Sequence, residues 1–352
     1  MTNNVALVLI NALAGLSLAP VTWMACLPLL VFYLGGAFCT GLEAKTQKRL
    51  GRKGAFQLGS WVALVVSGIG VLAVSMQSFS LLLVAALLAG YYSANGQMYR
   101  FAASELCAKE HQDKAVSWVI AGGLVGTVIS PNLAMTTKGV FDTPFVGSFV
   151  AVAVVALLSL LVMRYVTFTL INLDSLGNKL ERTLSVIVRQ PVFVVAALAA
   201  ALGSAVMQLL IDATPLVMKV RGFPFEDIVS VLRWHVIGMF APCLVTGHLI
   251  KRLGSLSIIY LGALLYLAGI AAMYTFVYIG FDFSVAEMNQ FLFAMFLLGL
   301  GWNFLFTGST SMTIQAYTNE EKTRAQAAIN FCVFVTMAIF TFAPAALMKT
   351  IG

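Results

Sequence analysis

Long apolar runs separated by short polar loops dominate the chain. A helix needs about 20 apolar residues to cross the hydrocarbon core of a membrane. The apolarity is continuous rather than alternating, which favours transmembrane helices over the strands of a β-barrel. Eleven spans are predicted at 4–19, 21–41, 55–75, 79–98, 116–136, 144–166, 192–218, 228–250, 255–278, 290–314 and 326–349.

Composition excludes most soluble classes. Of the 352 residues, 60% are apolar and only 10% are Asp, Glu, Lys or Arg, against about 25% charged residues in ordinary soluble domains. Mean hydropathy is +0.94. The five cysteines show no C-x-x-C spacing, so they indicate small buried hydrophobes rather than a metal site or a disulfide framework. We therefore expect an all-α integral membrane protein without a cofactor or a metal ion.

The positive charge predicts the topology. The net charge is +7, and sixteen of the 21 Lys and Arg residues fall on one side of the predicted spans against four on the other. Because cytoplasmic loops are enriched in Lys and Arg, the N-terminus and the basic loops are expected in the cytoplasm of a multi-pass inner (plasma) membrane protein. The excess of cations is a topology signal, so no nucleic-acid partner is expected.

The chain divides at its longest polar stretch. We predict an N-terminal bundle of six helices at 1–166, a cytoplasmic linker at 167–191 and a C-terminal bundle of five helices at 192–352. The two parts resemble each other, since Lys48-Arg49-Leu50-Gly51 recurs 203 residues later as Lys251-Arg252-Leu253-Gly254. Parallel repeats of this kind are one known transporter design, with the solute bound between the halves.

At these residues the chain resembles the major facilitator superfamily. The superfamily signature Gly-x-Leu-x-Asp-Arg-x-Gly-Arg-Arg corresponds to residues 44–53, and a second copy begins at Gly247. The resemblance implies two pseudo-symmetric bundles that alternate between two open states, with this loop acting as a cytoplasmic charge lock. Lys48 stands where the signature has Asp. The charge lock therefore cannot form with its usual acidic residue. The loop residues carried over are Lys48, Arg49, Gly51, Arg52, Lys251, Arg252 and Gly254.

Two further features bear on the resemblance. Residues 126–131 read Gly-Thr-Val-Ile-Ser-Pro, one substitution from a signature of exporters in the superfamily. Members normally have twelve spans, so eleven spans with a first run of only 16 residues, about 24 Å of helix, indicate a member shortened at both ends with its twelfth span missing.

Ionisable side chains inside predicted spans are expensive and mark function by default. Asp212 and Arg233 lie at similar depth in consecutive spans, about 9 Å and 7.5 Å from their ends. We expect them to pair as an outer gate or a proton-coupling pair, with His235 as a titratable neighbour. A static ion pair, or an Arg233 side chain that reaches the headgroups, is the alternative.

Polar stripes at helical spacing are the candidate solute path. A lipid-facing stripe would be costly, so these residues should face a central cavity, although interhelical packing is an equal alternative. The candidates are Ser204, Gln208, Asp212, Asn303, Thr307, Tyr92, Asn95, Trp302 and Asn330.

The leading hypothesis is a proton-coupled secondary active transporter that moves a small organic solute by alternating access. Vitamin uptake of the riboflavin type and drug efflux are alternatives within the superfamily, and a truncated, non-transporting membrane protein is a third. An enzyme is not expected, because H-E-x-x-H, G-x-S-x-G and Walker motifs are missing from the sequence. The expected partners are a small solute, protons and the lipid bilayer, and the expected state is a monomer.

Overall fold

The computed structural model describes residues 2–168, 182–279 and 284–351, and these contain helices but no strand. The all-helical membrane fold expected from the apolar runs is confirmed. The helices are α1 (Thr2–Leu18), α2 (Leu27–Ser75), α3 (Phe79–Gln97), α4 (Tyr99–Glu105), α5 (Gln112–Thr137), α6 (Val146–Tyr165), α7 (Leu184–Val188), α8 (Pro191–Val220), α9 (Phe225–Phe240), α10 (Cys243–Leu253), α11 (Ser255–Ile279), α12 (Ser284–Gln315) and α13 (Lys322–Ile351), with short 3₁₀ turns at Thr22–Cys26 and Lys109–His111.

The predicted spans map closely onto these helices. Within the described residues, nine helical stretches are long and apolar enough to cross a membrane. One of them covers Trp23–Ser75, 53 residues, and contains both predicted spans 21–41 and 55–75. Asn3–Leu18 is apolar but shorter, as expected for the first run. The count of eleven crossings stays a prediction.

Two glycines give the internal repeat a geometric counterpart. Gly51 interrupts α2 with φ 70° and ψ 176°, and Gly254 separates α10 from α11 with φ 83° and ψ 153°. A side chain would strain the backbone in this region, which glycine enters freely. Each copy of the repeated Lys-Arg-Leu-Gly motif therefore ends one helix and reverses the chain into the next.

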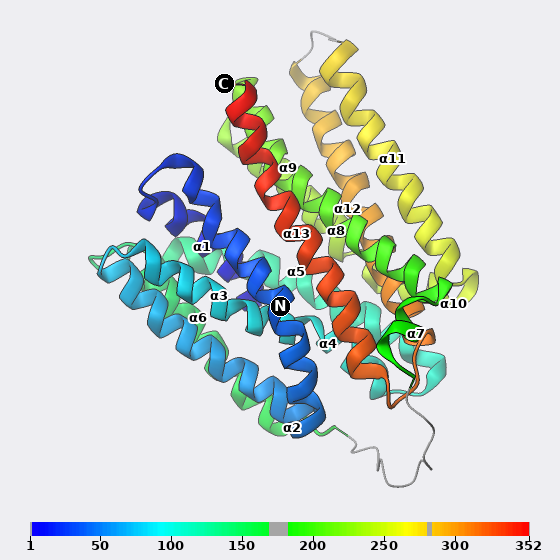
Figure 1. Ribbon diagram of the computed structural model, residues 1–352. Coiled ribbons are helices and arrows are strands. Elements are labelled where there is room, and N and C mark those ends of the chain that lie inside the picture. The colour runs from blue at the N-terminus through cyan, green and yellow to red at the C-terminus, as the bar shows by residue number, and fades with distance from the viewer. Residues whose placement is uncertain (1, 169–181, 280–283, 352) are drawn as a thin grey trace.

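We divide the helices by chain order into two groups, the N-terminal helices (α1–α6) and the C-terminal helices (α7–α13). Figure 1 shows α2, α3 and α6 on one side and α9 to α12 on the other, with α13 between them. α13 packs on both α2 and α8, and α5 packs on α9, α10 and α12. α2, α5 and α13 therefore carry much of the contact between the groups.

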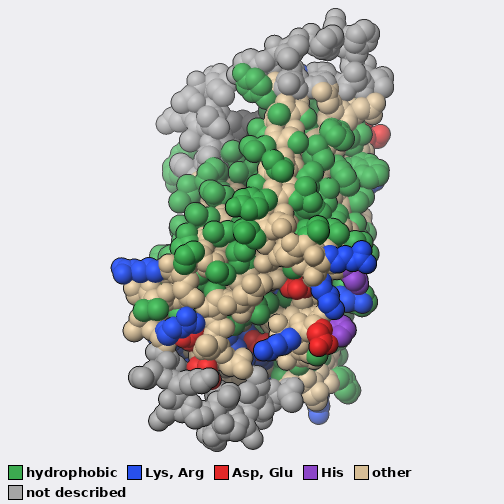
Figure 2. Space-filling model, turned by 90° about the vertical axis from the view of Figure 1, so that its right-hand side faces the viewer, with side chains coloured by type: hydrophobic (Ala, Val, Ile, Leu, Met, Phe, Trp, Pro, Cys, Tyr) green, Lys and Arg blue, Asp and Glu red, His purple; other side chains and the backbone are tan. Residues whose placement is uncertain are grey.

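Hydrophobic and charged side chains lie at different levels on the face drawn in Figure 2. On this face hydrophobic side chains cover the upper part, and most Lys, Arg, Asp, Glu and His side chains gather below them. We call this the basic end, the end that carries Arg52, Lys53, Arg164, Arg182 and Lys322. Lys53 donates to the Arg164 carbonyl oxygen at 2.8 Å, which joins two of the loops predicted to lie on one side. Most of the expected linker, residues 169–181, lies outside the described residues.

Candidate functional site

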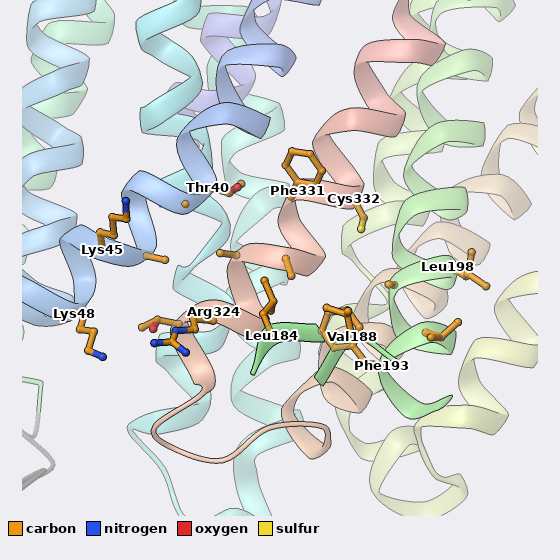
Figure 3. A pocket seen from close by; sticks show the side chains of 17 residues that line it. Thr40, Lys45, Lys48, Leu184, Val188, Phe193, Leu198, Arg324, Phe331 and Cys332 are labelled. Carbon is orange, nitrogen blue, oxygen red and sulfur yellow. The ribbon is translucent and has the colours of Figure 1, made fainter. Parts of the chain in front are cut away.

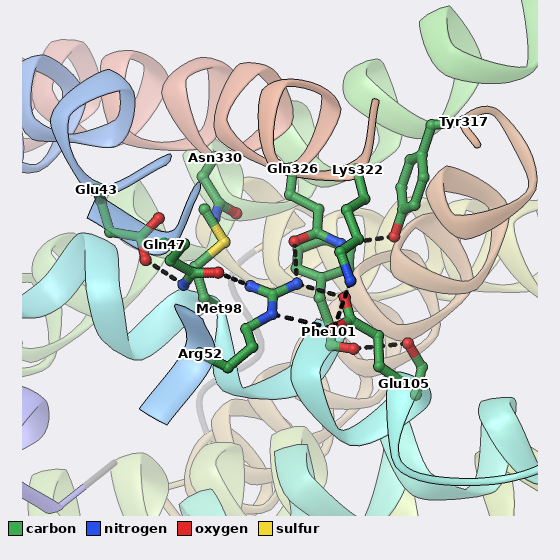
Figure 4. Close-up of polar contacts among 11 residues, drawn as sticks. Glu43, Gln47, Arg52, Met98, Phe101, Glu105, Tyr317, Lys322, Gln326 and Asn330 are labelled. Atoms are coloured by element: carbon green, nitrogen blue, oxygen red, sulfur yellow. Dashed lines mark hydrogen bonds and ion pairs between the residues drawn. The ribbon is translucent and has the colours of Figure 1, made fainter. Parts of the chain in front are cut away.

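A network of polar side chains joins the two helix groups at the basic end. The Glu105 carboxylate of α4 accepts hydrogen bonds from Arg52 of α2 and, at 3.0 Å, from Lys322 Nζ of α13. Arg52 also donates to Gln326 Oε1 of α13 at 2.8 Å. Figure 4 shows these side chains converging from both groups. The network holds the groups together at this end.

Arg52 is further fixed by its own helix group. Gln47 accepts a hydrogen bond from Arg52 and donates one to Glu43, which is fully buried. The sequence predicted that the usual lock could not form, because Lys48 replaces the signature acid. A charge lock nevertheless exists, and Glu105 supplies its carboxylate. Lys48 and Arg49 are exposed.

Two more contacts close the basic end. Gly247 of α10 packs against the backbone of Asp113 and Lys114 at the start of α5, and Asp113 accepts a hydrogen bond from Ser311 of α12. Lys251 and Arg252 are exposed at the end of α10. The first glycine of the second motif copy therefore serves close helix approach, while its cations face outward.

An ion pair fixes the segment before α7. Arg182 donates to both carboxylate oxygens of Glu321, at 2.7 and 2.6 Å, and Glu321 also accepts from the Thr318 backbone N–H at 3.0 Å. Glu321 is almost fully buried. The hydrogen bonds from Arg182 lower the pKa of Glu321 to about 2, because they favour the ionised carboxylate.

A buried arginine sits between the groups, deeper than the lock. Arg100 of α4 is 2% exposed and donates from Nη2 to Asn330 Oδ1 of α13 at 2.7 Å. Its guanidinium lies 4.0 Å from the centre of the Phe306 ring and 4.9 Å from that of Phe101. Nε and Nη1 have no hydrogen-bond partner among the described residues. A buried cation with two unpaired donors is costly, so it calls for a role beyond packing.

Arg100 caps an aromatic column. The Phe306 ring, under the Arg100 guanidinium, stacks on Trp302 with centroids 4.6 Å apart and planes at 15°. Trp302 then meets Phe240 edge-on at 5.7 Å. Phe240 packs against Gly123 of α5. The column thus lies where α9 and α12 face α4 and α5, and Trp302 Nε1 is buried without a partner among the described residues.

The stripe on α8 reaches the N-terminal helices. Tyr33 of α2 donates to Gln208 Oε1 at 3.1 Å, and Gln208 Nε2 donates to Asp212 Oδ2 at 2.8 Å. Ser204 is buried on the same face of α8. The stripe therefore contacts the N-terminal helices, and its role in lining a solute path stays a prediction.

Asp212 and Arg233 do not pair. Among the described residues Asp212 is bonded to Gln208, whereas Arg233 is exposed on α9. Equal depth in consecutive helices did not suffice, because Asp212 is half-buried beside Gln208 whereas Arg233 lies on the exposed face of α9. His235 is fully buried, with Nδ1 2.7 Å from the Met295 carbonyl oxygen, and makes no hydrogen bond or ion pair with Asp212 among the described residues. This places His235 among the packing contacts of α9 with α12.

Other stripe residues pack within one group. Asn303 donates to the Met239 carbonyl oxygen at 2.6 Å and accepts from Thr246 at 2.7 Å, all within the C-terminal helices. Asn95 donates to the Ala55 carbonyl oxygen at 2.9 Å within the N-terminal helices. Thr307 and Tyr92 are buried. In this conformation the contacts of Asn303 and Asn95 fit the packing alternative. Thr307 Oγ1 has no hydrogen-bond partner among the described residues, and Asn330 and Trp302 lie between the groups.

Comparison with known proteins agrees with this architecture. The family model of the Major Facilitator Superfamily matches residues 1–341. The chain belongs to this superfamily. It is 32% identical over 345 residues to the riboflavin transporter RfnT of Brucella anthropi, covering 97% of this chain and 84% of the relative. It is also 25% identical to the uncharacterized MFS-type transporter YddS of Bacillus subtilis, over 83% of this chain and 69% of that protein.

Solved structures show the same fold. The proton:xylose symporter XylE bound to 6-bromo-6-deoxy-D-glucose aligns with a TM-score of 0.78 at 12% identity, over 99% of this chain and 86% of XylE. A bacterial homologue of the iron transporter ferroportin, in an outward-facing state, aligns with a TM-score of 0.63 at 16% identity, over 99% of this chain and 87% of the homologue. The protein is thus a multi-pass membrane transporter of the Major Facilitator Superfamily.

Sequence reasoning missed several residues that this superfamily member uses at the contact between its groups. Glu105 lies in the loop between the predicted spans 79–98 and 116–136, and nothing in the sequence separates it from Glu110 and Asp113 in the same loop. Tyr33 and Phe306 carry no polar pattern that would separate them from core aromatics. Their roles depend on which helices face each other, which one sequence does not reveal.

Proposed function

We propose that this protein imports a planar aromatic solute of the riboflavin type across the inner (plasma) membrane, driven by a proton gradient. The observation that carries the proposal is the stack of Trp302 on Phe306, capped by Arg100, between the two groups. Planar heteroaromatic rings bind by stacking on such side chains. Their ring carbonyl groups would accept from Trp302 Nε1 and the free Arg100 nitrogens. The riboflavin transporter relative supports this solute class.

Alternating access would expose the column. The proposed N-terminal bundle (1–166) and C-terminal bundle (192–352), joined by the linker (167–191), would rock about the site. With the basic loops and the N-terminus in the cytoplasm, the network around Glu105 closes the cytoplasmic side. This conformation is then outward-facing. Breaking the network would open Arg100 and Trp302 to the cytoplasm, and a monomer suffices for this cycle.

Asp212 is the proposed proton carrier. It is half-buried in α8, and its hydrogen bond to Gln208 links it to Tyr33 of the other group. Protonation removes the negative charge of Asp212 and so weakens the hydrogen bond that Gln208 donates to it. Gln208 is then held less firmly in the position where it accepts from Tyr33. Proton binding would in this way alter the contact between the bundles.

The test is uptake of labelled riboflavin by proteoliposomes. An inward proton gradient should drive accumulation by the parent protein. Asp212→Asn should abolish gradient-driven accumulation while retaining exchange of labelled for unlabelled riboflavin without a gradient. Exchange does not require net proton movement, so this split separates coupling from binding. Gradient-driven accumulation unchanged by Asp212→Asn would remove the proton role.

A second pair of variants tests the aromatic site. Trp302→Leu should raise the half-saturating riboflavin concentration about tenfold, roughly 1.4 kcal/mol of lost stacking, whereas Trp302→Phe should retain most of the affinity. Equal effects of the two variants would contradict stacking. If correctly inserted parent protein neither exchanges nor accumulates riboflavin, the solute class is wrong.

A further inference from the structure

A groove separate from the proposed solute site lies between the two groups near the basic end. Its volume is about 770 Å³, and its walls come from α2, α7, α8 and α13. It takes in the last turns of α2 before Gly51 and the first turns of α8 and α13. These turns adjoin the basic loops, so the groove sits at the level where headgroups meet the apolar core of a membrane.

One part of the groove is apolar and open to the outside. Leu184, Val194, Leu198 and Phe331 line it and are 40% to 54% exposed. Small side chains such as Ala327 leave space between them. This lining matches hydrocarbon chains rather than a water-soluble ligand.

The other part of the groove is cationic. Lys45, Lys48 and Arg324 line it, and the described part of the chain adds no Asp or Glu to the lining. Figure 3 shows these three side chains on one side and Phe193, Leu198 and Phe331 on the other. Lys45 and Lys48 come from α2 and Arg324 from α13, so the charged part is built by both groups.

We propose that this groove binds an anionic phospholipid from the bilayer leaflet at the basic end. The phosphate would lie among Lys45, Lys48 and Arg324, and an acyl chain would lie along Val194, Leu198 and Phe331. Charge complementarity selects the headgroup, because each basic side chain near an anionic lipid surface raises the binding constant about fivefold. The apolar wall selects a lipid over free phosphate. The proposal is independent of the transported solute and of Asp212.

The experiment reads the composition of lipid in contact with the groove. A photoreactive benzoylphenylalanine replaces Phe331 in the full-length protein, which is reconstituted in phosphatidylcholine containing a minority of phosphatidylglycerol. Mass spectrometry identifies the adducts after illumination. Benzoylphenylalanine at Ile339, an exposed residue of the same helix outside the groove lining, is the matched control.

We expect phosphatidylglycerol adducts at position 331 to exceed their share of the bilayer at least about fivefold, and adducts at 339 to match that share. The triple variant Lys45→Gln, Lys48→Gln, Arg324→Gln should remove the enrichment. Lys109→Gln, Lys251→Gln, Arg252→Gln, a triple change of exposed cations outside the groove lining, should leave it unchanged.

Three outcomes would overturn the proposal. Adducts at 331 could match the bulk lipid, the enrichment could survive the triple change in the groove, or the probe could react with the protein's own chain instead of lipid. Riboflavin exchange by the groove triple variant is measured in parallel. If exchange is retained, a negative result for the lipid contradicts the lipid proposal alone and leaves the proposed transport function standing.

Discussion

Arg100 of α4 and Asn330 of α13 join the two helix groups through a single buried hydrogen bond of 2.7 Å. Both side chains are almost inaccessible, and two Arg100 nitrogens have no partner among the described residues. The pair therefore joins the two groups while leaving donors unused, which suits a contact that is exchanged during the proposed transport cycle.

Arg100→Met and Asn330→Leu should have different effects on stability. Arg100→Met removes an incompletely paired charge and fills similar space, so the melting temperature in detergent should stay unchanged or rise. Asn330→Leu leaves the buried Arg100 guanidinium without its acceptor and should lower the free energy of unfolding by about 3 kcal/mol. Both should impair transport. Equal losses of stability in thermal melts would show that Arg100 is an ordinary structural anchor.

Glu105→Gln should open the basic end. It leaves Arg52 and Lys322 facing each other without the carboxylate that both contact. Spin labels at positions 109 and 251, one in each group, should report a population with longer separations in pulsed distance measurements. Glu110→Gln, an exposed neighbour, is the control. An unchanged distance distribution in Glu105→Gln would argue against the lock.

Gly247→Ala should push α10 away from the start of α5. A methyl group at 247 would lie 2.7 Å from the Asp113 carbonyl oxygen and 2.8 Å from the Lys114 Cα, and backbone atoms cannot move aside locally. The same spin-label pair should therefore shift toward the open state. Gly122→Ala on α5 meets nothing within 4 Å and should leave the distances unchanged. Identical behaviour of the two variants would show that α5 and α10 do not need this close approach.

The Arg182–Glu321 pair should make stability depend on pH in the acid range. The pKa of Glu321 is lowered from 4.5 to about 2, so its ionised form stabilises the folded state fully above pH 4.5 and loses this contribution as the pH falls toward 2. Glu321→Gln should cost about 1 kcal/mol at pH 6, since Arg182 is partly exposed. The difference between the parent and variant melting temperatures should shrink on acidification. A constant difference from pH 6 to pH 3 would exclude ionisation as its source.

Much of the helical architecture followed from the sequence. The run 255–278 became α11 (Ser255–Ile279), and 79–98 became α3 (Phe79–Gln97), because a backbone in lipid must satisfy its hydrogen bonds within each apolar segment. The repeated Lys-Arg-Leu-Gly motif indicated that the two parts resemble each other, and its glycines, Gly51 and Gly254, both adopt positive φ. Short-range chemistry alone specifies these features.

Side-chain partners across helices were predicted less well. Asp212 pairs with Gln208 rather than with Arg233, and the carboxylate of the lock comes from Glu105 rather than from position 48. Asn303, for which the solute path and interhelical packing were equal alternatives, is bonded to α9 and α10. In each case helix depth was predictable, whereas the direction of the side chain around the helix axis was not.

The sequence by itself determined that the chain spans a membrane, where its helices lie and that its two parts share a motif, because these properties depend on hydropathy and on backbone conformations within a few residues. Tertiary structure alone decided which helix faces meet, placing Arg100 over Phe306 and Glu105 between Arg52 and Lys322. Those contacts join residues more than 50 positions apart, and packing of whole helices sets their rotation and distance.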